Sequence, residues 1–437
     1  MKIASPVFRL EAWLPLLVAE WRGRNRRAPS SSPAGSGEKS LGDRELAGIS
    51  EALLRLQRGL TGERQLLGGD PGNRTYMDSP EMLGAYLLYY WAVSFLETSL
   101  SLDLIDRPAF RVLDLGAGPG PASAAFLGRG ARHFVLVDGS AEALSLAKNL
   151  LAGGAVAPVA AAGVATLQAD LARGLPPLEG PFDAIVASKL LNELWKDEAD
   201  RIARRVALVE TAAAHLASGG FVLVIEPATL AASRDALALR DALCARGWHI
   251  AGPCTHSGTC PALAAGPARS CHGQAAWTPG APMAELAAGA GLDRSSVKWS
   301  WFACLPPGSG ERPANKASPG AKAIGERLSG RVVSDGMLNK AGRLRYAVCT
   351  SGAEPAGDCG PAGDCEPGGS LVTLSARSGS PEALAAGFAS LRRHDLLTVE
   401  GAERREGGLG LVPTTKISVT RAPAAHAPAA HAPGVDG

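Results

Sequence analysis

The sequence predicts an α/β fold built around an open, mainly parallel sheet. Between residues 110 and 251, short apolar runs alternate with longer helical patterns, which is typical of such a sheet. The first apolar run leads into a glycine-rich turn, FRVLDLGAGPG (residues 110–120), and a run of small residues follows it. A tight strand-to-helix turn needs glycine because its backbone takes permissive φ values and approaches a ligand closely.

The expected elements follow from these periodicities. In the central region we expect strands at 110–115, 133–138, 164–168, 182–188, 221–226 and 248–251, and helices at 121–130, 141–152, 197–217 and 230–246. Before it, helical spacing covers 8–21, 43–60 and 78–102. After it, strand-like runs at 331–333, 343–349 and 371–376 precede a helix expected at 381–397.

These elements divide the chain of 437 residues into several units. The expected units are an N-terminal helical region (1–105) with a Ser/Pro/Gly/Ala linker (28–38), a central domain (106–305) with a cysteine-rich segment (252–280), a linker (306–330), a small β subdomain (331–400) and a low-complexity tail (401–437).

Composition limits the function classes. The net charge of +2 does not by itself indicate a nucleic-acid partner, but residues 294–349 carry ten Lys/Arg against three Asp/Glu. This segment faces either phosphate or water. No apolar run is long enough for a membrane span, and the N-terminus makes a poor signal peptide. Eight cysteines in such a chain indicate a reducing, cytoplasmic compartment and ligand chemistry.

Two acids frame the glycine turn. Asp114 ends the first strand, and Asp138 ends the second, where it could accept hydrogen bonds from a ribose diol. The turn lacks the GK[ST] of a phosphate-binding P-loop and the dinucleotide pattern G-x-G-x-x-G. Together with Gly116 and Gly118, the acids are similar to the S-adenosylmethionine site of class I methyltransferases. The alternative is a nucleotide-like turn that binds nothing.

Polar residues follow three later strands. Asp170 stands where this fold often places a carboxylate near the adenine amine, although a helix cap would explain it too. Asn192 and Glu193, in SKLLNEL, lie beyond the fourth strand, facing the sulfonium of the cofactor. There they could position an acceptor or do acid–base work, or merely cap a helix. Glu226 ends the next strand at the same edge.

The cysteine-rich segment predicts a metal or cluster site. Cys254, Cys260 and Cys271 lie within eighteen residues, among Gly, Pro and Ser. Their spacing is not that of a zinc ribbon, and thiolate-rich sites also suit iron–sulfur clusters. The fourth ligand stays open between Cys304, Cys349, Cys359 and Cys365, with His256 or His272 able to complete a zinc site.

Several motifs together resemble one family. LDLGAGPG, SKLLNEL, VIEP, PCTHSGTCP with a later Cys-His pair, KWSWFAC and the strand ending in Cys349 occur in the order typical of the methyltransferase-like proteins of the small ribosomal subunit, found in bacteria and mitochondria. The resemblance covers roughly residues 75–376. Two positions that are aromatic in the family hold Ser270 and Gly273, and the basic segment that usually follows them is replaced, so we expect a different surface toward rRNA here.

The resemblance implies a class I methyltransferase (Rossmann-like) fold that binds S-adenosylmethionine, and an iron–sulfur cluster, 4Fe-4S, with zinc as the alternative. Its four ligands carry over to Cys254, Cys260, Cys271 and Cys349. The expected partner is the small ribosomal subunit and its rRNA, for a protein that is monomeric when free. Three functions stay open: rRNA methylation, a non-catalytic assembly factor that binds RNA, and a small-molecule methyltransferase with structural zinc.

Overall fold

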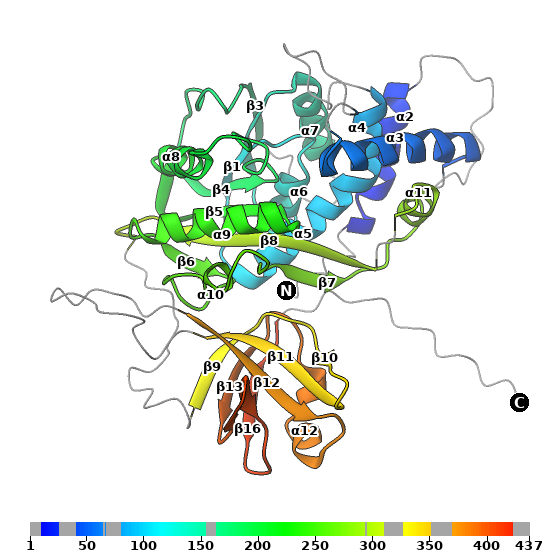
Figure 1. The fold of residues 1–437 in the computed structure, drawn as a ribbon. Helices are drawn as coiled ribbons and strands as arrows, with labels where there is room; N and C mark the ends of the chain where they lie inside the picture. Colours follow the sequence, from blue (N-terminus) through cyan, green and yellow to red (C-terminus); the bar gives the residue numbers. More distant parts are fainter. Residues whose placement is uncertain are drawn as a thin grey trace, which may run out of the picture.

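The computed structural model describes residues 10–25, 41–63, 66, 80–153, 163–292, 295–309, 327–350 and 369–422. These residues form two sheets, each with its own hydrophobic core (Figure 1). The predicted linker at 28–38, Cys359 and Cys365 lie outside the described residues.

The larger sheet has the strand order β3-β2-β1-β4-β5-β8-β6, and β7 pairs with β8. Its strands are β1 (Arg111–Leu115), β2 (His133–Asp138), β3 (Gly163–Gln168), β4 (Phe182–Ser188), β5 (Leu216–Pro227), β6 (His249–Gly252), β7 (Gly273–Ala276) and β8 (Ser296–Leu305). The first five strands are parallel, and β8 runs antiparallel between β5 and β6. This order, with one reversed strand near the edge, is that of the class I methyltransferase sheet, so the predicted fold class is confirmed.

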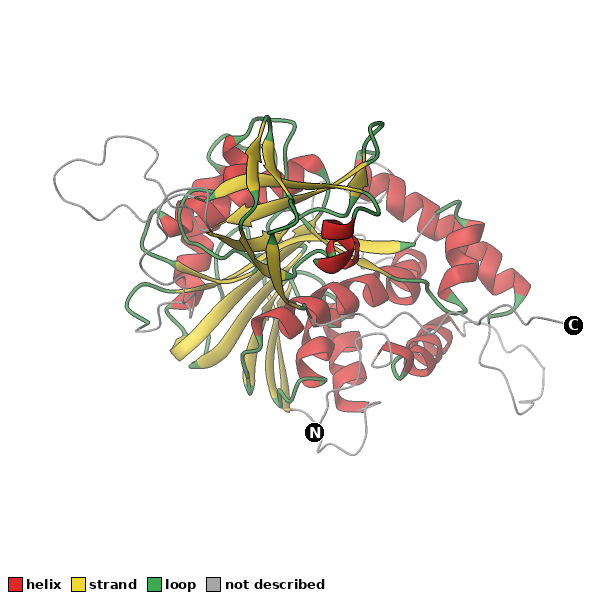
Figure 2. Cartoon of the chain, turned by 90° about the horizontal axis from the view of Figure 1, so that it is seen from below, coloured by secondary structure: helices red, strands yellow, loops and turns green. Residues whose placement is uncertain are grey.

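Helices cover both faces because alternate strand residues point to opposite sides. One face packs on α6 (Pro121–Leu127), α7 (Ala141–Gly153) and the N-terminal helices, and the other on α8 (Arg201–Ala213) and α9 (Leu230–Cys244). Figure 2 shows the layers from below. In β1, for example, Val112 is buried on the first face and Leu113 on the second. The strands therefore read as continuous apolar runs, as parallel strands do.

The N-terminal helices extend this core. They are α2 (Leu14–Asn25), α3 (Asp43–Thr61), α4 (Pro80–Ala85), the π-helical turn η3 (Tyr86–Tyr90) and α5 (Trp91–Ile105). Helix α5 is buried from Trp91 to Leu102. The indole Nε1 of Trp91 donates to the carbonyl of Pro119, 3.0 Å away, in the glycine-rich turn. The N-terminal region thus packs directly on the turn that the sequence singles out.

The smaller sheet has the order β14-β15-β12-β11-β9-β13-β16, with β10 paired to β11. Its elements are β9 (Arg327–Val332), β10 (Met337–Leu338), β11 (Arg343–Thr350), β12 (Ser370–Arg377), α12 (Pro381–Ala385), η4 (Phe388–Ser390), β13 (Leu396–Glu400), β14 (Glu403–Arg405), β15 (Gly408–Gly410) and β16 (Lys416–Thr420). In the larger domain, α10 (Pro261–Ala264) and α11 (Met283–Gly289) complete the described elements.

Three predictions for the C-terminal part were wrong. The helix expected at 381–397 ends at Ala385, because Gly387 takes φ +59° and a strand begins at Leu396. The low-complexity tail does not begin at 401, since β14, β15 and β16 complete the sheet up to Thr420. Strand β9 likewise starts inside the predicted linker. Short strands rich in glycine and charge gave little periodicity to read.

Candidate functional site

The glycine-rich turn follows β1 at the carboxyl edge of the larger sheet. Gly116 has φ +67° and Gly118 has φ +50°, backbone conformations that favour glycine. A Cβ atom at Gly116 would lie 2.8 Å from Cδ1 of Leu190, which is too close for any side chain. The amides of Gly116 and Ala117 both donate to the carbonyl of Val137, which ties the turn to the end of β2.

Asp138 closes this turn from the neighbouring strand. Its Oδ2 accepts a hydrogen bond from the amide of Gly118 at 2.8 Å, and its Oδ1 accepts one from the amide of Ser140 at 2.8 Å. The side chain is half-buried at the sheet edge. Each carboxylate oxygen has more than one lone pair, so these bonds leave Asp138 able to accept from a ribose diol as well.

Asp114 is buried beneath the turn and directed at α6. Its Oδ2 accepts from the Oγ of Ser123 at 2.6 Å and from the amide of Ser123 at 3.2 Å. Burial raises the pKa of Asp114 to about 7, with a smaller contribution from the charge of Asp138. Asp114 therefore braces the start of α6, and any effect on a ligand passes through the shape of the turn.

Asp170 lies exposed just beyond β3. Its Oδ1 accepts from the amide of Ala172 at 3.0 Å, and its Oδ2 lies 3.2 Å from Nε of Arg173. These contacts cap a turn, and no helix begins directly after Asp170 in the described residues, so the helix cap that the sequence left open as an alternative is not found. The register of β2 and β3 aligns Asp138 with Gln168, so Asp170 still stands at the same edge as the glycine turn.

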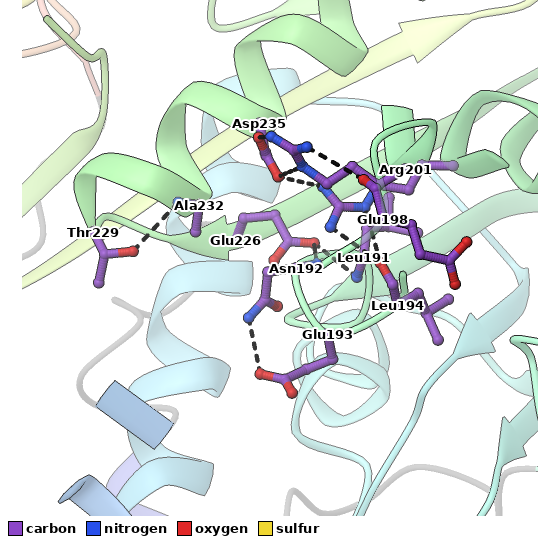
Figure 3. Close-up of polar contacts among 11 residues, drawn as sticks. Leu191, Asn192, Glu193, Leu194, Glu198, Arg201, Glu226, Thr229, Ala232 and Asp235 are labelled. Atoms are coloured by element: carbon purple, nitrogen blue, oxygen red, sulfur yellow. Dashed lines mark hydrogen bonds and ion pairs between the residues drawn. The ribbon is translucent and has the colours of Figure 1, made fainter. Parts of the chain in front are cut away.

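Asn192 and Glu193 lie in the segment after β4 (Figure 3). The side-chain amide of Asn192 donates to Oε1 of Glu193 at 3.1 Å. Oε1 of Glu226, at the end of β5, accepts from the backbone amides of Leu191 (2.9 Å) and Asn192 (3.3 Å). Glu226 thus holds the segment that presents both predicted residues, a role that its place at the strand end did not reveal.

Glu226 is almost completely buried, and burial raises its pKa to about 8 against the opposing effects of the bonded amides and the Arg205 charge. Among the described residues, neither its Oε2 nor Oδ1 of Asn192 has a hydrogen-bond partner. Both side chains line a small pocket between the sheet edge and the helices α8 and α9. The pocket is lined by Leu191, Asn192, Arg205, Glu226, Ala232, Asp235, Ala236 and Leu239.

Two arginines of α8 fix the outer wall of this pocket (Figure 3). Arg201 and Arg205 both bind Oδ2 of Asp235 on α9, at 2.8 Å each. Arg205 also donates to the carbonyl of Leu194, 3.0 Å from its Nη2. The loop after β4 is therefore held by Glu226 from the sheet and by Arg205 from the helix.

The sequence reasoning missed an ion pair at the same edge. Nζ of Lys189, directly after β4, lies 2.8 Å from Oε2 of Glu97 on α5 and donates to Oγ of Ser94 at 3.2 Å. Lys189 has φ +56°, which is uncommon for a side chain of this size. The sequence feature that indicates such a pair is Glu97, an acid within the apolar run WAVSFLETSL, because a buried carboxylate needs a partner.

The four predicted cysteine ligands come from different elements at the junction of the two sheets. Cys254 follows β6, Cys260 precedes α10, Cys271 precedes β7 and Cys349 lies in β11. The amide of Cys260 donates to both carboxylate oxygens of Asp241. Sγ of Cys349 lies 3.6 Å from Nε2 of His256, which joins the smaller sheet to the cysteine-rich segment.

Three of the four thiols, those of Cys260, Cys271 and Cys349, have pKa values that burial and neighbouring thiols raise. Burial, and next the Cys254 thiol, raise the pKa of Cys260 to about 11 and that of Cys271 to about 12. Burial also raises the pKa of Cys349, and the three other thiols add to this effect. Even so, within the described part of the chain no group of three or more His, Cys, Asp or Glu side chains is arranged to hold a metal ion.

Arginines surround these thiols. Arg240 interacts electrostatically with Cys254, and Arg331 with Cys254 and Cys349. Among the described residues, the buried Nε of each of these two arginines lacks a hydrogen-bond partner. Arg393 lies near Cys271 and donates to the carbonyl of His272. Arg240 already pairs with Asp241 at 2.6 Å and Arg393 with Asp335 at 3.4 Å, whereas half-buried Arg331 has no carboxylate within ion-pair distance among the described residues. A buried cation calls for an anionic partner, and thiolates on a metal would supply one to Arg331. The four thiols and the positive charge around them therefore fit a metal or cluster that is bound by thiolates.

Cys304 is not part of this group. It lies in β8 within the core on the α8–α9 side, completely buried. Burial raises its pKa well above the ordinary value, and interaction with Cys244 raises it further. Among the described cysteines, Cys304 therefore acts as core, as the sequence allowed.

No helix among the described residues has the length and apolar character needed to cross a membrane. A search of curated proteins returned no match.

Known structures with similar folds include several methyltransferases. A ribosomal protein L11 methylase from Lactobacillus delbrueckii subsp. bulgaricus is 16% identical, with 49% of this chain and 78% of that chain covered and a TM-score of 0.29. A SAM-dependent methyltransferase from Leishmania major is 15% identical over 61% and 87%, with a TM-score of 0.33. The plantazolicin methyltransferase BamL, in complex with SAH, is 16% identical over 44% and 60%, with a TM-score of 0.26. The fold assignment rests on the strand order.

A family model matches the middle of the chain. It is described as mitochondrial small ribosomal subunit Rsm22 and matches residues 89–285. The matched part includes the glycine turn, the segment after β4 and the first three predicted cysteine ligands, Cys254, Cys260 and Cys271, and it ends before Cys349. The centre of the chain is thus similar to the Rsm22 family, within a fold of the class I methyltransferase type.

Proposed function

We propose that this protein binds S-adenosylmethionine at the glycine turn and acts as a methyltransferase on the small ribosomal subunit. The observation that carries the proposal is the turn itself: Gly116 and Gly118 with positive φ, closed by the Asp138 carboxylate at the carboxyl edge of the sheet. Ligands of open α/β sheets bind at this edge. The match of residues 89–285 to the Rsm22 family supports the small subunit as partner.

The residues divide the work of binding by position. Asp138 accepts from the ribose hydroxyls, and Asp170, exposed beside it, serves the adenine end. Asp114 keeps the turn in shape through Ser123. Asn192 and Glu193, beyond β4, position the methyl acceptor, and Glu226 holds their loop through two backbone amides.

A second function has its own support. Asn192 donates to Glu193, so the two predicted acceptor residues bind each other rather than standing open to an acceptor. An assembly factor that keeps the fold and the cofactor site but transfers no methyl group would tolerate this arrangement. Methyl transfer to small subunits that lack the modification separates the two functions.

Cofactor binding and partner binding are tested separately. Calorimetry with S-adenosylmethionine should give saturable binding to the folded protein, and co-sedimentation should place the protein with small subunits rather than large subunits. Absence of cofactor binding in well-folded protein would remove the methyltransferase function. Equal co-sedimentation with small and large subunits would refute the small subunit as the specific partner.

We further propose that Cys254, Cys260, Cys271 and Cys349 hold an iron–sulfur cluster. Support comes from the closeness of the thiols, which raises the pKa values of Cys260, Cys271 and Cys349, and from the guanidinium groups of buried Arg240 and half-buried Arg331 beside them. Metal binding requires thiolates, and it would release the protons that burial now keeps on the sulfurs. The group would supply a link between the larger sheet and β11.

Zinc is the alternative occupant, and colour separates the two. A cluster absorbs broadly near about 400 nm, whereas zinc is colourless because its d shell is full. Protein purified without oxygen should be brown and contain iron and sulfide. Colourless, zinc-loaded protein would replace the cluster by zinc, and protein without either metal would refute the site.

A further inference from the structure

The outer face of the smaller sheet carries arginines on the adjacent strands β11 and β12 and on the edge strand β14. In β11 and β12, Arg343 lies directly opposite Arg377, and Arg345 lies opposite Ser375. The alternate residues Tyr346, Leu374 and Ala376 are buried in the core. Because successive strand residues point to opposite faces, the arginines share the face turned away from that core.

A fourth arginine, Arg405 of β14, lies on the same face, beyond β15. Ser375 of β12 pairs with Gly410 of β15, which extends the row that begins at Arg345. A Cβ atom at Gly410 would lie within the side chain of Arg405, so Arg405 crosses the sheet over this glycine. Arg343, Arg345, Arg377 and Arg405 are called the arginine face below.

The arginine face carries an excess of basic side chains over the acids near it, Glu382 and Glu403. Among the described residues, none of its members has a carboxylate within ion-pair distance, and the one side-chain contact is from Nη2 of Arg343 to Oγ of Ser375 at 3.3 Å. Glu382 is the acid within electrostatic range: hydrogen bonds at the start of α12 lower its pKa, and Arg405 and Arg343 lower it further. Glu403 lies on the same face of the edge strand β14.

Like charges directly opposite each other on a sheet destabilise it, so this arrangement costs stability without an external anion. Three of the four side chains are exposed, and Arg343 is half-buried. Guanidinium groups bind phosphate through two parallel hydrogen bonds. The hydroxyl of Thr373 stands on the same face of β12, and such a group also donates to phosphate. The hydroxyl of Ser375 already donates to the carbonyl of Leu409 at 3.4 Å.

We infer that the arginine face binds the phosphate backbone of RNA, which rests on the proposed small-subunit function and adds the surface that carries the contact. The face binds backbone rather than bases, because in the described residues its members are arginines and hydroxyls without an exposed aromatic ring among them. Sequence preference would come from elsewhere on the protein.

The test measures how the affinity of the full-length protein for a small-subunit rRNA transcript changes with salt. Each phosphate contact contributes roughly 0.7–0.9 to the slope of log K against log salt. Replacing Arg345 and Arg377 by Gln should lower that slope by about 1.4–1.8 if each makes one contact. The charge-preserving change of both to Lys should keep the slope.

A matched control removes the same charge elsewhere. Arg44→Gln with Arg55→Gln changes two exposed arginines of α3, and the slope should stay within error of the parent protein. An unchanged slope in the Arg345/Arg377 variant, or an equal loss in the α3 variant, would overturn the inference and leave the proposed function standing. A parent protein that binds no small-subunit rRNA at low salt would refute the proposed function itself. If the parent protein bound anionic vesicles more tightly than RNA, and the Arg345/Arg377 variant lost that binding, the arginine face would bind a membrane surface and the inference would be overturned.

Discussion

The role of Asp138 can be separated from its structural support by comparison with a second aspartate. Asp138 accepts two backbone hydrogen bonds at the carboxyl edge of the sheet, from Gly118 and Ser140. Asp183 accepts two at the opposite edge, from the amides of Phe110 (2.9 Å) and Arg111 (2.8 Å). Both side chains are half-buried, so the two are alike in exposure, and each accepts from at least two backbone amides.

Alanine at either position removes two charge-assisted bonds. The expected loss in the free energy of unfolding is about 2–4 kcal/mol for each variant, similar because the partners are alike. Only Asp138→Ala should also weaken S-adenosylmethionine binding, by roughly 1–3 kcal/mol, since only that carboxylate lies at the edge where we propose that the ribose diol binds. This corresponds to about a 5-fold to 150-fold rise in Kd.

Calorimetric titration at a temperature where both variants are folded gives the two affinities. Asp183→Ala should bind the cofactor as the parent protein does. Equal weakening in the two variants would mean that the effect of Asp138 is structural, and unchanged affinity in Asp138→Ala would place the ribose elsewhere.

Three further changes test other parts of the site. Burial raises the pKa of Glu226 to about 8 in the folded protein, above its unfolded value, so the parent protein loses stability as pH rises between about 4.5 and about 8, by at most about 1.4 kcal/mol per pH unit. Glu226→Gln should remove this dependence, which denaturant titration at several pH values measures. Equal changes of the free energy of unfolding with pH in the variant and the parent would contradict the prediction. Asn192→Ala should reduce methyl transfer at saturating cofactor while changing cofactor Kd less than about 3-fold, and a matching loss of both would assign Asn192 to the cofactor instead. Cys349→Ser should bleach the absorption of anaerobically purified protein and Cys304→Ser should not, and an intact spectrum in the first variant would move the fourth ligand.

The sequence predicted the parallel strands of the central sheet because they are apolar runs between clear turns. It did not predict β7, and the helix expected at 197–217 ends at Ala213, with β5 beginning at Leu216. The strands ending at Asp138 and Ser188 were predicted with the bounds that the structure gives. The C-terminal sheet was harder, since β14 and β15 are short and carry mainly charge and glycine. Their place depends on pairing with β12, a non-local contact that no local pattern encodes.

For the site, the sequence identified groups at strand ends but not their partners. The positions of Asp114 and Asp138 follow from the glycine turn, whereas the direction of each side chain does not. That Asp114 turns toward Ser123, and that Glu226 binds two amides of the following loop, depends on packing between elements. The pair of Lys189 and Glu97 likewise joins residues far apart in the chain.

The most direct test of the central claim is methyl transfer to its proposed substrate. Small subunits from cells that lack this protein are incubated with the purified protein and S-adenosylmethionine carrying a labelled methyl group, and label is counted in the RNA and protein fractions. The account predicts stoichiometric label in small-subunit rRNA that is lost with Asp138→Ala and retained with Asp183→Ala. No label above background from protein that binds the cofactor would contradict it.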